Sequence, residues 1–376
     1  MKPSGRLRKC VMRVVSWVAV AGLIGGSMAC AGNPEHGNPT VAKTEPDGAT
    51  NGRTDGGGIA DSPSANETDG STATSADGSS PVGDAVGSIG EAGLNLVTPT
   101  QTSNDGNYSF SFGDVVFEVD SQIGARVAVL TLGTVSLVEQ PVRDLTQWGS
   151  TFWTSPQSDW KPSTWPPPAS IDADPYTGGP SGGHLVLTSA EDPTTGISVT
   201  KDYSVDGTSG WIHITYTILA TTAFSAAPWE DTRVPRGGLA FFPAGTSLDA
   251  GPLTMTATSG IEWFDDSSET ATSQSGSKAI ADGSGGWTAY AVQGVLFLKK
   301  FTATPANDVA PGEGSVEIYP GSGFLELETQ GPYTSIPANG SLPWSMDWRV
   351  VTIPSSVTVA PGSSTLVTFA EQQAAM

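Results

Sequence analysis

Two glutamates in the last sixty residues stand in a pattern that suits proton transfer. Residues 324–330 read FLELETQ, which sets Glu326 and Glu328 two positions apart in an alternating segment. A β-strand turns every second side chain to the same face, so both carboxylates would share one face. Neighbouring carboxylates raise one another's pKa, which suits a general acid or base. The alternative is that both glutamates face solvent on an acidic sheet.

A second segment has the composition of a sugar-binding loop. Residues 147–176 contain four Trp, one Tyr and six Pro within thirty residues. Proline fixes φ and removes backbone donors, so we expect a rigid extended loop here. Indole rings stack on the face of a sugar, and polar side chains reach its hydroxyls. The candidate binding residues of this loop are Trp153, Gln157, Asp159, Trp160, Trp165 and Tyr176. Alternatively, its rings cap the end of a β-sandwich as additional core.

The composition excludes several classes of protein. There are 17 Lys and Arg against 38 Asp and Glu, and the net charge is −21. No basic surface can be assembled at this balance, so we expect no nucleic-acid partner. The chain has two Cys and three His, and it contains no Asp-x-Asp-x-Asp loop. We therefore expect no metal site, no disulfide framework and no cofactor.

The first thirty residues indicate export. A basic start without acids precedes an apolar run over 14–24 and a group of small residues before Cys30. This order is typical of a secretory signal peptide, here residues 1–29. Ala29-Cys30 resembles the lipobox of bacterial lipoproteins, in which the Cys is acylated; the alternative is ordinary cleavage after Ala29 or Ala31. We expect an exported protein of the bacterial cell envelope that is anchored through Cys30 to a membrane, with the outer membrane favoured, and that faces the periplasm or the cell surface.

The signal is followed by a predicted tether, residues 30–92. Residues 31–90 contain no Phe, Trp or Tyr and carry nine acids against two bases. Such a segment cannot bury enough apolar area to offset its backbone entropy, so we expect it to be disordered. It would serve as a flexible linker between the lipid anchor and a folded domain.

Residues 93–376 form the predicted domain. Segments of alternating apolar and polar residues recur between turns rich in Gly and Pro, at 108–112, 127–130, 197–201, 211–216, 295–298, 316–319 and 347–351. We find no convincing amphipathic helix. The predicted fold class is therefore all-β, with two large antiparallel sheets packed face to face.

Three stretches of this domain resemble the galactose mutarotase-like superfamily, which includes the aldose 1-epimerases. Residues 119–127, VDSQIGARV, resemble its early strand and Gly-Ala turn. Residues 149–160, GSTFWTSPQSDW, resemble the tryptophan loop of an uncharacterised branch. Residues 324–333, FLELETQGPY, resemble the late strand on which epimerases carry their catalytic Glu. The resemblance implies an antiparallel two-sheet β-supersandwich that handles carbohydrate.

The resemblance also implies a reaction. In an epimerase a carboxylate takes the proton of the anomeric hydroxyl and an imidazole protonates the ring oxygen. Glu328 matches the base by its motif. Residues 227–234, where the family carries a His, contain none here; Glu230 and Arg233 are the local candidates. An Arg beside a Glu and a Trp would bind an acidic sugar through bidentate contacts, and the alternative is an ion pair at a strand end.

The candidate site combines these residues. Its candidate catalytic residues are Glu328, Glu326, His184 and Glu230, and Arg233 and Gln330 join the tryptophan loop as candidate binding residues. His184 is alternatively a solvated strand residue. Three functions follow: an anchored carbohydrate-binding protein, an aldose 1-epimerase-like enzyme, or a structural envelope lipoprotein without catalysis. Fold alone does not choose among them.

Overall fold

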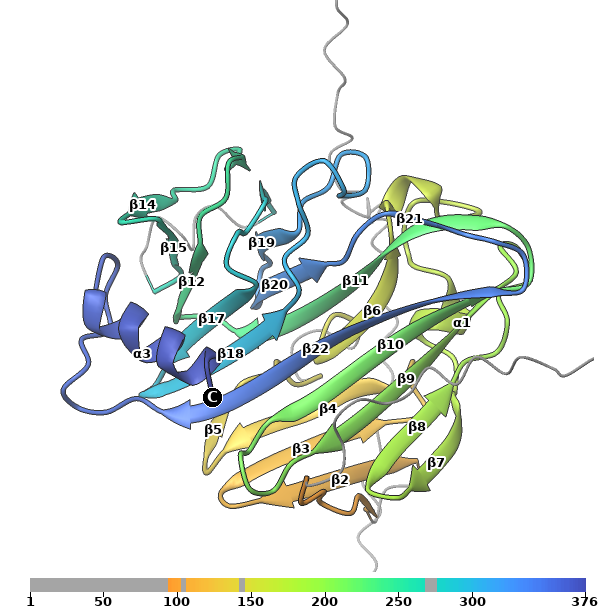
Figure 1. The fold of residues 1–376 in the computed structure, drawn as a ribbon, viewed down its shortest axis with the longest axis horizontal. Coiled ribbons are helices and arrows are strands. Elements are labelled where there is room, and N and C mark those ends of the chain that lie inside the picture. Colours follow the sequence, from red (N-terminus) through yellow and green to blue (C-terminus); the bar gives the residue numbers. More distant parts are fainter. Residues whose placement is uncertain (1–93, 103–105, 142–145, 268–275) are drawn as a thin grey trace, which may run out of the picture. The chain divides into compact units, whose positions relative to one another are not determined.

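The computed structural model describes residues 94–102, 106–141, 146–267 and 276–376, which form two antiparallel sheets (Figure 1). The predicted signal peptide, Cys30 and the tether over 30–92 lie outside the described residues. The export of the chain, the acylation of Cys30 and the disorder of the tether stay predictions.

The first sheet contains the strands that carry the candidate glutamates. In order across the sheet these are β1 (Thr100–Gln101), β2 (Asn107–Phe112), β3 (Val115–Asp120), β4 (Arg126–Leu132), β6 (Ser150–Ser155), β11 (Phe224–Pro235), β20 (Phe324–Gln330), β19 (Val316–Pro320), β16 (Ala279–Ala281) and β13 (Leu248–Asp249). Two short strands lie off this path, β5 (Val135–Ser136) beside β4 and β21 (Thr334–Ile336) beside β11.

The second sheet covers the apolar side of the first. Its strand order is β14 (Thr256–Thr258), β15 (Ile261–Asp265), β12 (Leu239–Pro243), β17 (Trp287–Val292), β18 (Val295–Phe301), β22 (Gly340–Thr352), β10 (Ile212–Ala220), β9 (Ile197–Val205), β8 (His184–Thr188) and β7 (Thr177–Ser181). The long strand β22 pairs with β18 on one side and with β10 on the other (Figure 1).

The two sheets pack face to face around one apolar core. Phe152 of β6 stacks on Tyr216 of β10, with ring centroids 4.3 Å apart. Phe117 of β3 meets Trp348 of β22 edge to face at 6.3 Å. Burial of such large rings supplies most of the free energy that holds two sheets together. The predicted all-β sandwich of two antiparallel sheets is confirmed.

The aromatic segment is not one continuous loop. The run STFWTS precedes the first proline of the segment, keeps all its backbone donors and forms β6, which pairs with β11 and β4. The prolines then confine the irregular part to the residues after 155. These include a 3₁₀ turn η1 (Gln157–Asp159) and a single helical turn α1 (Ala169–Asp172).

The expectation that no amphipathic helix is present is wrong for α3 (Ser364–Ala374). This helix begins after Ser363, whose side-chain oxygen accepts a hydrogen bond from the backbone of Leu366 at 3.2 Å. Leu366 and Ala370, one turn apart, are buried against the outer face of the second sheet beside β18 (Figure 1). Within the described ranges, no helix has both the length and the apolar character needed to cross a bilayer.

Candidate functional site

Strand alternation in the middle of the first sheet gathers charged side chains on one face. β11 lies between β6 and β20 and turns Asp231 and Arg233 away from the second sheet. The register sets Glu328 of β20 opposite Asp231, and Glu326 opposite Arg233. Glu317 of β19 stands opposite Glu328. These residues, here called the charged face, are each at most 8% exposed.

Arg233 pairs with two acids of the charged face. Its Nη2 lies 2.7 Å from Asp231 Oδ2, and its Nε donates to Glu326 Oε1 at 2.9 Å. Its Cζ lies 5.2 Å from the centre of the Trp153 ring. Two carboxylates therefore already compensate the charge of this guanidinium. This pairing argues against the acidic sugar that the sequence suggested as its partner.

Lys278, just before β16, pairs with two acids on the other side of the charged face. Its ammonium donates to Glu317 Oε2 at 2.5 Å and to Glu328 Oε2 at 2.9 Å. The same Nζ lies 4.9 Å from the Trp229 ring centre. A cation held between two carboxylates and an indole face combines charge pairing with a cation–π contact.

A third ion pair borders the face on the side of α1. Arg126 Nη2 lies 3.0 Å from Asp172 Oδ1, which also accepts from Trp153 Nε1 at 2.8 Å. Burial alone would raise the pKa of Asp172, but Arg126 and the indole hydrogen bond hold it below its ordinary value. The close approach of α1 depends on Gly124, where φ is +62° and a Cβ would come within 2.1 Å of Asp172 O.

Four indoles pack together beside the charged face. Trp160 stacks on Trp229 with centroids 5.8 Å apart, and Trp153 meets both rings edge to face at 5.5 and 5.1 Å. These three side chains are at most 4% exposed. Trp165 packs on Trp153 at 6.0 Å but remains 45% exposed. We call these four residues the tryptophan cover.

Trp229 joins the cover to the charged face, since its Nε1 donates to Glu328 Oε2 at 2.8 Å. Several other buried polar atoms here make no hydrogen bond to any described residue. They are Arg126 Nε, Arg233 Nη1, Asp231 Oδ1, Glu328 Oε1 and Gln330 Oε1, while Asp231 Oδ2 has only its ion pair with Arg233. A buried polar atom without a partner costs free energy, so such a group of donors and acceptors is typical of a place where a polar ligand or water binds.

Burial changes the acidity of the glutamates in this region. It raises the pKa of Glu328 to about 7, against the opposing effect of Lys278. It also raises the pKa of Glu326 to about 7, with Arg233 opposing. For Asp231 burial again outweighs the nearby Arg233, and the pKa lies well above its ordinary value. Carboxyl groups with such pKa values exchange protons near neutral pH.

Seven of the residues proposed from the sequence come together in and around the charged face. They are Glu326, Glu328, Arg233, Gln330, Trp153, Trp160 and Trp165. Gln330 lies one strand repeat beyond Glu328, and its Nε2 donates to Glu317 Oε1 at 3.1 Å. The expected alternation of Glu326 and Glu328 onto one face agrees with the register.

Three residues of the tryptophan segment lie elsewhere. Asp159 is exposed, and the side chain of half-buried Gln157 donates to Thr164 O at 2.7 Å. Tyr176 is 3% exposed and its hydroxyl donates to Ile171 O at 2.8 Å, so its ring belongs to the core between the sheets. None of these three residues offers an open aromatic surface on which a sugar could stack.

The structure separates Glu230 and His184 from the charged face. Glu230 is fully buried between the sheets, where it forms an ion pair with Lys299 of β18 and accepts from Ser150 Oγ at 2.6 Å. Alternation along β11 directs Glu230 inward because Asp231 faces outward. His184 belongs to β8 of the second sheet, and its Nδ1 lies 2.8 Å from Asp202 Oδ1.

Sequence reasoning missed Asp231, Glu317, Lys278, Arg126 and Asp172 in this region. Asp231 lies two residues before Arg233 on the same strand, so strand alternation would have placed both on one face. Glu317 follows from alternation in β19, but only once β19 is known to pair with β20. Lys278 had no such signal because it lies outside a strand and far from its partners in sequence.

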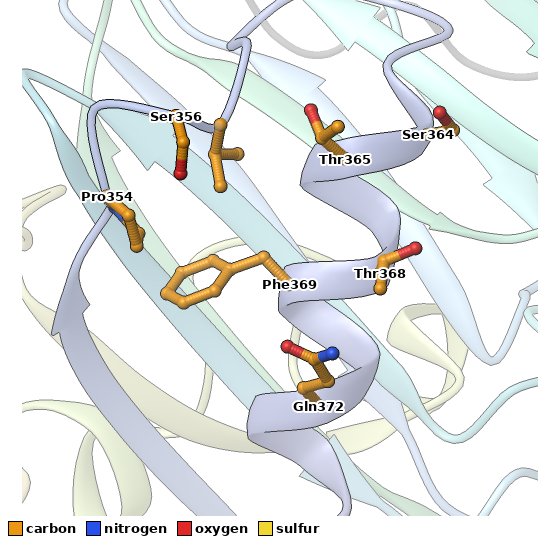
Figure 2. A pocket seen from close by; sticks show the side chains of 8 residues that line it. Pro354, Ser356, Ser364, Thr365, Thr368, Phe369 and Gln372 are labelled. Carbon is orange, nitrogen blue, oxygen red and sulfur yellow. The ribbon is translucent and has the colours of Figure 1, made fainter.

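A separate groove lies beside α3 (Figure 2). Its cavity volume is about 490 Å³, and it lies between the helix and the turn after β22. Phe369 points from the helix toward Pro354 across this groove (Figure 2). None of the side chains that line it is charged, so it offers no acid–base chemistry.

Comparison with known proteins gives a family and a set of distant structural similarities. The family model "Domain of unknown function (DUF4380)" matches residues 122–351. No curated protein matches the chain. A galactose mutarotase-like protein from Lactobacillus casei is 12% identical, with 65% of this chain and 100% of that chain covered and a TM-score of 0.48.

Two further solved structures are similar at the same level. The Slr1438 protein from Synechocystis is 11% identical, with 68% of this chain and 98% of that chain covered and a TM-score of 0.48. Galactose 1-epimerase from Lactobacillus acidophilus is 11% identical, with 69% and 99% covered and a TM-score of 0.42. Two of the three names belong to the superfamily that the sequence motifs resemble.

Proposed function

The chain belongs to the DUF4380 family, and from this premise we propose that it binds carbohydrate on the charged face beneath the tryptophan cover. The observation that carries the proposal is the group of buried donors and acceptors without partners beside a cluster of indoles. One similar structure is that of a galactose mutarotase-like protein, and we propose a sugar as the ligand of this chain too.

The unpartnered atoms have the chemistry that a sugar needs. Arg233 Nη1 and Arg126 Nε are donors, whereas Glu328 Oε1 and the Asp231 oxygens accept when ionised. Sugar hydroxyls both donate and accept, so one ring can satisfy both kinds of atom. Indole faces pack against the C–H groups of such a ring. The combination favours a polyhydroxylated ligand over a purely apolar one.

Entry of this ligand requires the cover to move. Trp160 is 3% exposed and stacks on Trp229, whose Nε1 is bonded to Glu328. Trp160 follows η1 in the irregular part of the chain, whereas Trp153 and Trp229 are fixed in adjacent strands. We therefore assign the opening movement to Trp160, with exposed Trp165 as the first indole that an arriving sugar meets.

One observation favours a second function, interconversion of sugar anomers. Glu328 Oε1 lacks a hydrogen-bond partner, and its pKa of about 7 suits removal of a proton from an anomeric hydroxyl. The charged face itself contains no His, so Glu326 or Asp231 in its protonated form would supply the proton to the ring oxygen. A structural lipoprotein without ligand remains the contrasting hypothesis.

We propose in addition that the protein is exported and lipid-anchored in the cell envelope. The support is the basic, apolar and small-residue order of residues 1–29 followed by Cys30. In this arrangement the acidic segment over 30–92 would hold the carbohydrate-binding domain away from the membrane.

A glycan array with the secreted domain tests the main proposal. We expect retention of at least one glycan, and a loss of tenfold or more in affinity for Trp160→Ala and Trp165→Ala. Trp211→Phe is the matched control, because Trp211 packs in the separate cluster beside α3 and should leave binding unchanged. An array on which the folded wild-type domain retains nothing contradicts the proposal.

A further inference from the structure

Building on the proposed carbohydrate site, we propose that its ligand is an amino sugar whose ammonium group binds between Asp231 and Glu328. This inference names the chemical class of the ligand, and it rests on the proposed function. It replaces the acidic sugar that was suggested by the sequence around Arg233.

The charged face has more buried carboxylates than cations to pair with them. Arg233 is shared by Asp231 and Glu326, and Lys278 is shared by Glu317 and Glu328. Each cation thus serves two buried carboxylates. Arg126 adds no surplus, because its guanidinium pairs with Asp172. A buried carboxylate that lacks a full counter-charge is costly, and a ligand with a positive charge relieves that cost.

The acceptors without partners show where positive charge is lacking on this face. Asp231 and Glu328 stand directly opposite one another on β11 and β20, so their side chains are cross-strand neighbours. Neither Asp231 oxygen has the geometry of a hydrogen bond, although Oδ2 is close to Arg233, and Glu328 Oε1 has no partner among the described residues. An ammonium group carries three donors and no acceptor, which suits this pair.

A neutral side chain supplies an independent indication. Gln330 is 0% exposed and follows Glu328 on the same face of β20. Its Nε2 is fixed by donation to Glu317 Oε1, which leaves Oε1 as an acceptor without a partner. Three residues of this face therefore present free acceptors near one another, and the third is not an acid.

An organic cation fits this arrangement better than a metal ion. Among the described residues, no group of three or more His, Cys, Asp or Glu is disposed to hold a metal. Burial also raises the pKa of both Asp231 and Glu328, because their ionised forms lack sufficient counter-charge. The two indoles nearest these acids, Trp229 and Trp153, already face Lys278 and Arg233, so the oxygen acceptors would hold the ligand's ammonium.

The test measures the affinity of the intact protein for four matched classes of sugar by calorimetry at pH 7, where the amino group of a hexosamine is mostly protonated. The sugars are the hexosamine, the N-acetylhexosamine, the neutral hexose and the hexuronate, each in the gluco and galacto series. We expect the hexosamine to bind at least tenfold more tightly than the neutral hexose, and the N-acetyl sugar and uronate to bind no better than the hexose. Acetylation is the sharpest comparison because it removes the charge and keeps the ring.

Variants then locate the ammonium. Asp231→Asn and Glu328→Gln should each abolish the preference for the hexosamine, and Glu262→Gln, a buried acid of the second sheet, should leave it intact. If the neutral hexose or the uronate binds as tightly as the hexosamine, the ammonium inference is wrong and carbohydrate binding stands. If no sugar binds, both fail. The comparison among sugars uses the wild-type domain, so it holds even if a variant does not fold.

Discussion

Glu230 and Asp231 are consecutive in the sequence and face opposite sides of the first sheet. Glu230 lies between the sheets and pairs with Lys299, whereas Asp231 joins the charged face beside Arg233. One strand thus supplies a buried ion pair to the core and an acid to the candidate site. The two carboxylates should respond differently to mutation, because Glu230 is fully engaged in the core, whereas Asp231 has one oxygen in an ion pair with Arg233 and the other without a partner.

Removing one member of the inner pair should destabilise the protein strongly. Glu230→Gln leaves the Lys299 ammonium in the core with hydroxyl and carbonyl partners only, at a cost of about 3–5 kcal/mol. The double variant Glu230→Gln, Lys299→Met should recover part of this loss. Urea unfolding measures these differences, with exposed Asp159→Asn as the control. Equal stability of Glu230→Gln and wild type would contradict the pairing.

Stability should fall as the pH rises from about 5 to 7. The ordinary pKa of Glu is 4.5, and burial raises that of Glu326 and of Glu328 to about 7. Between these values the folded state binds more protons than the unfolded chain, so the unfolding free energy decreases with pH. Each isolated shift corresponds to about 3 kcal/mol, and coupling makes the sum smaller.

The groups that face this pair are Asp231, Glu313, Glu317, Tyr319, Lys278 and Arg233, and the pKa of each acid among them is raised as well. Lys201, whose pKa burial lowers to about 7, loses its proton in the folded state near pH 7 and opposes this trend there, so the fall in stability is clearest between pH 5 and 6. Unfolding curves at pH 5, 6 and 7 give the slope. The double variant Glu326→Gln, Glu328→Gln should flatten it, and a wild-type stability that rises with pH would refute the assignment.

If the protein interconverts anomers, Glu328 should be required for it. We expect Glu328→Gln to reduce the rate by a factor of about 100 or more, the usual contribution of a general base. Affinity for a neutral aldose should change only a few-fold, because an amide keeps the size and polarity of the side chain. Anomer-exchange NMR measures the rate. Retention of full activity in this variant would assign the chemistry to another group.

The predicted lipid anchor can be tested in the full chain. Cys30→Ser should move the protein from the membrane to the soluble fraction when it is expressed in a bacterial host. Cys10→Ser is the matched control, since Cys10 lies in the segment that would be removed with the signal. Mass spectrometry of the mature N-terminus identifies the acyl chains. Equal partitioning of wild type and Cys30→Ser would exclude an anchor at this residue.

Local patterns predicted the strands and the shared face of Glu326 and Glu328, because period two is a property of a single strand. They could not predict how strands far apart in sequence pair, and the charged face depends on that pairing. Trp153 illustrates the difference. Its neighbours suggested an exposed loop, but β6 lies inside the sheet, and the ring is buried against Trp229.

The structure differs from the sequence-based prediction at two further places, Arg233 and helix α3, and each difference has a physical cause. Arg233 seemed free to bind an acid because Glu326 is 93 residues away in sequence, yet the two are hydrogen-bonded. The helix α3 carried its own signal, a Ser cap followed by Leu366 and Ala370 one turn apart. That signal is short, and it is stabilised mainly by burial against the second sheet.

The position of β22 has a consequence for how the chain acquires its structure. Residues 340–352 are the only described link by which the half of the second sheet from β14 to β18 pairs with the half from β10 to β7. During synthesis this strand emerges after every other strand of the second sheet, so neither half can pair with the other until residues 340–352 have been made. In the export proposed above, this order of synthesis keeps the second sheet open while the chain is still being made.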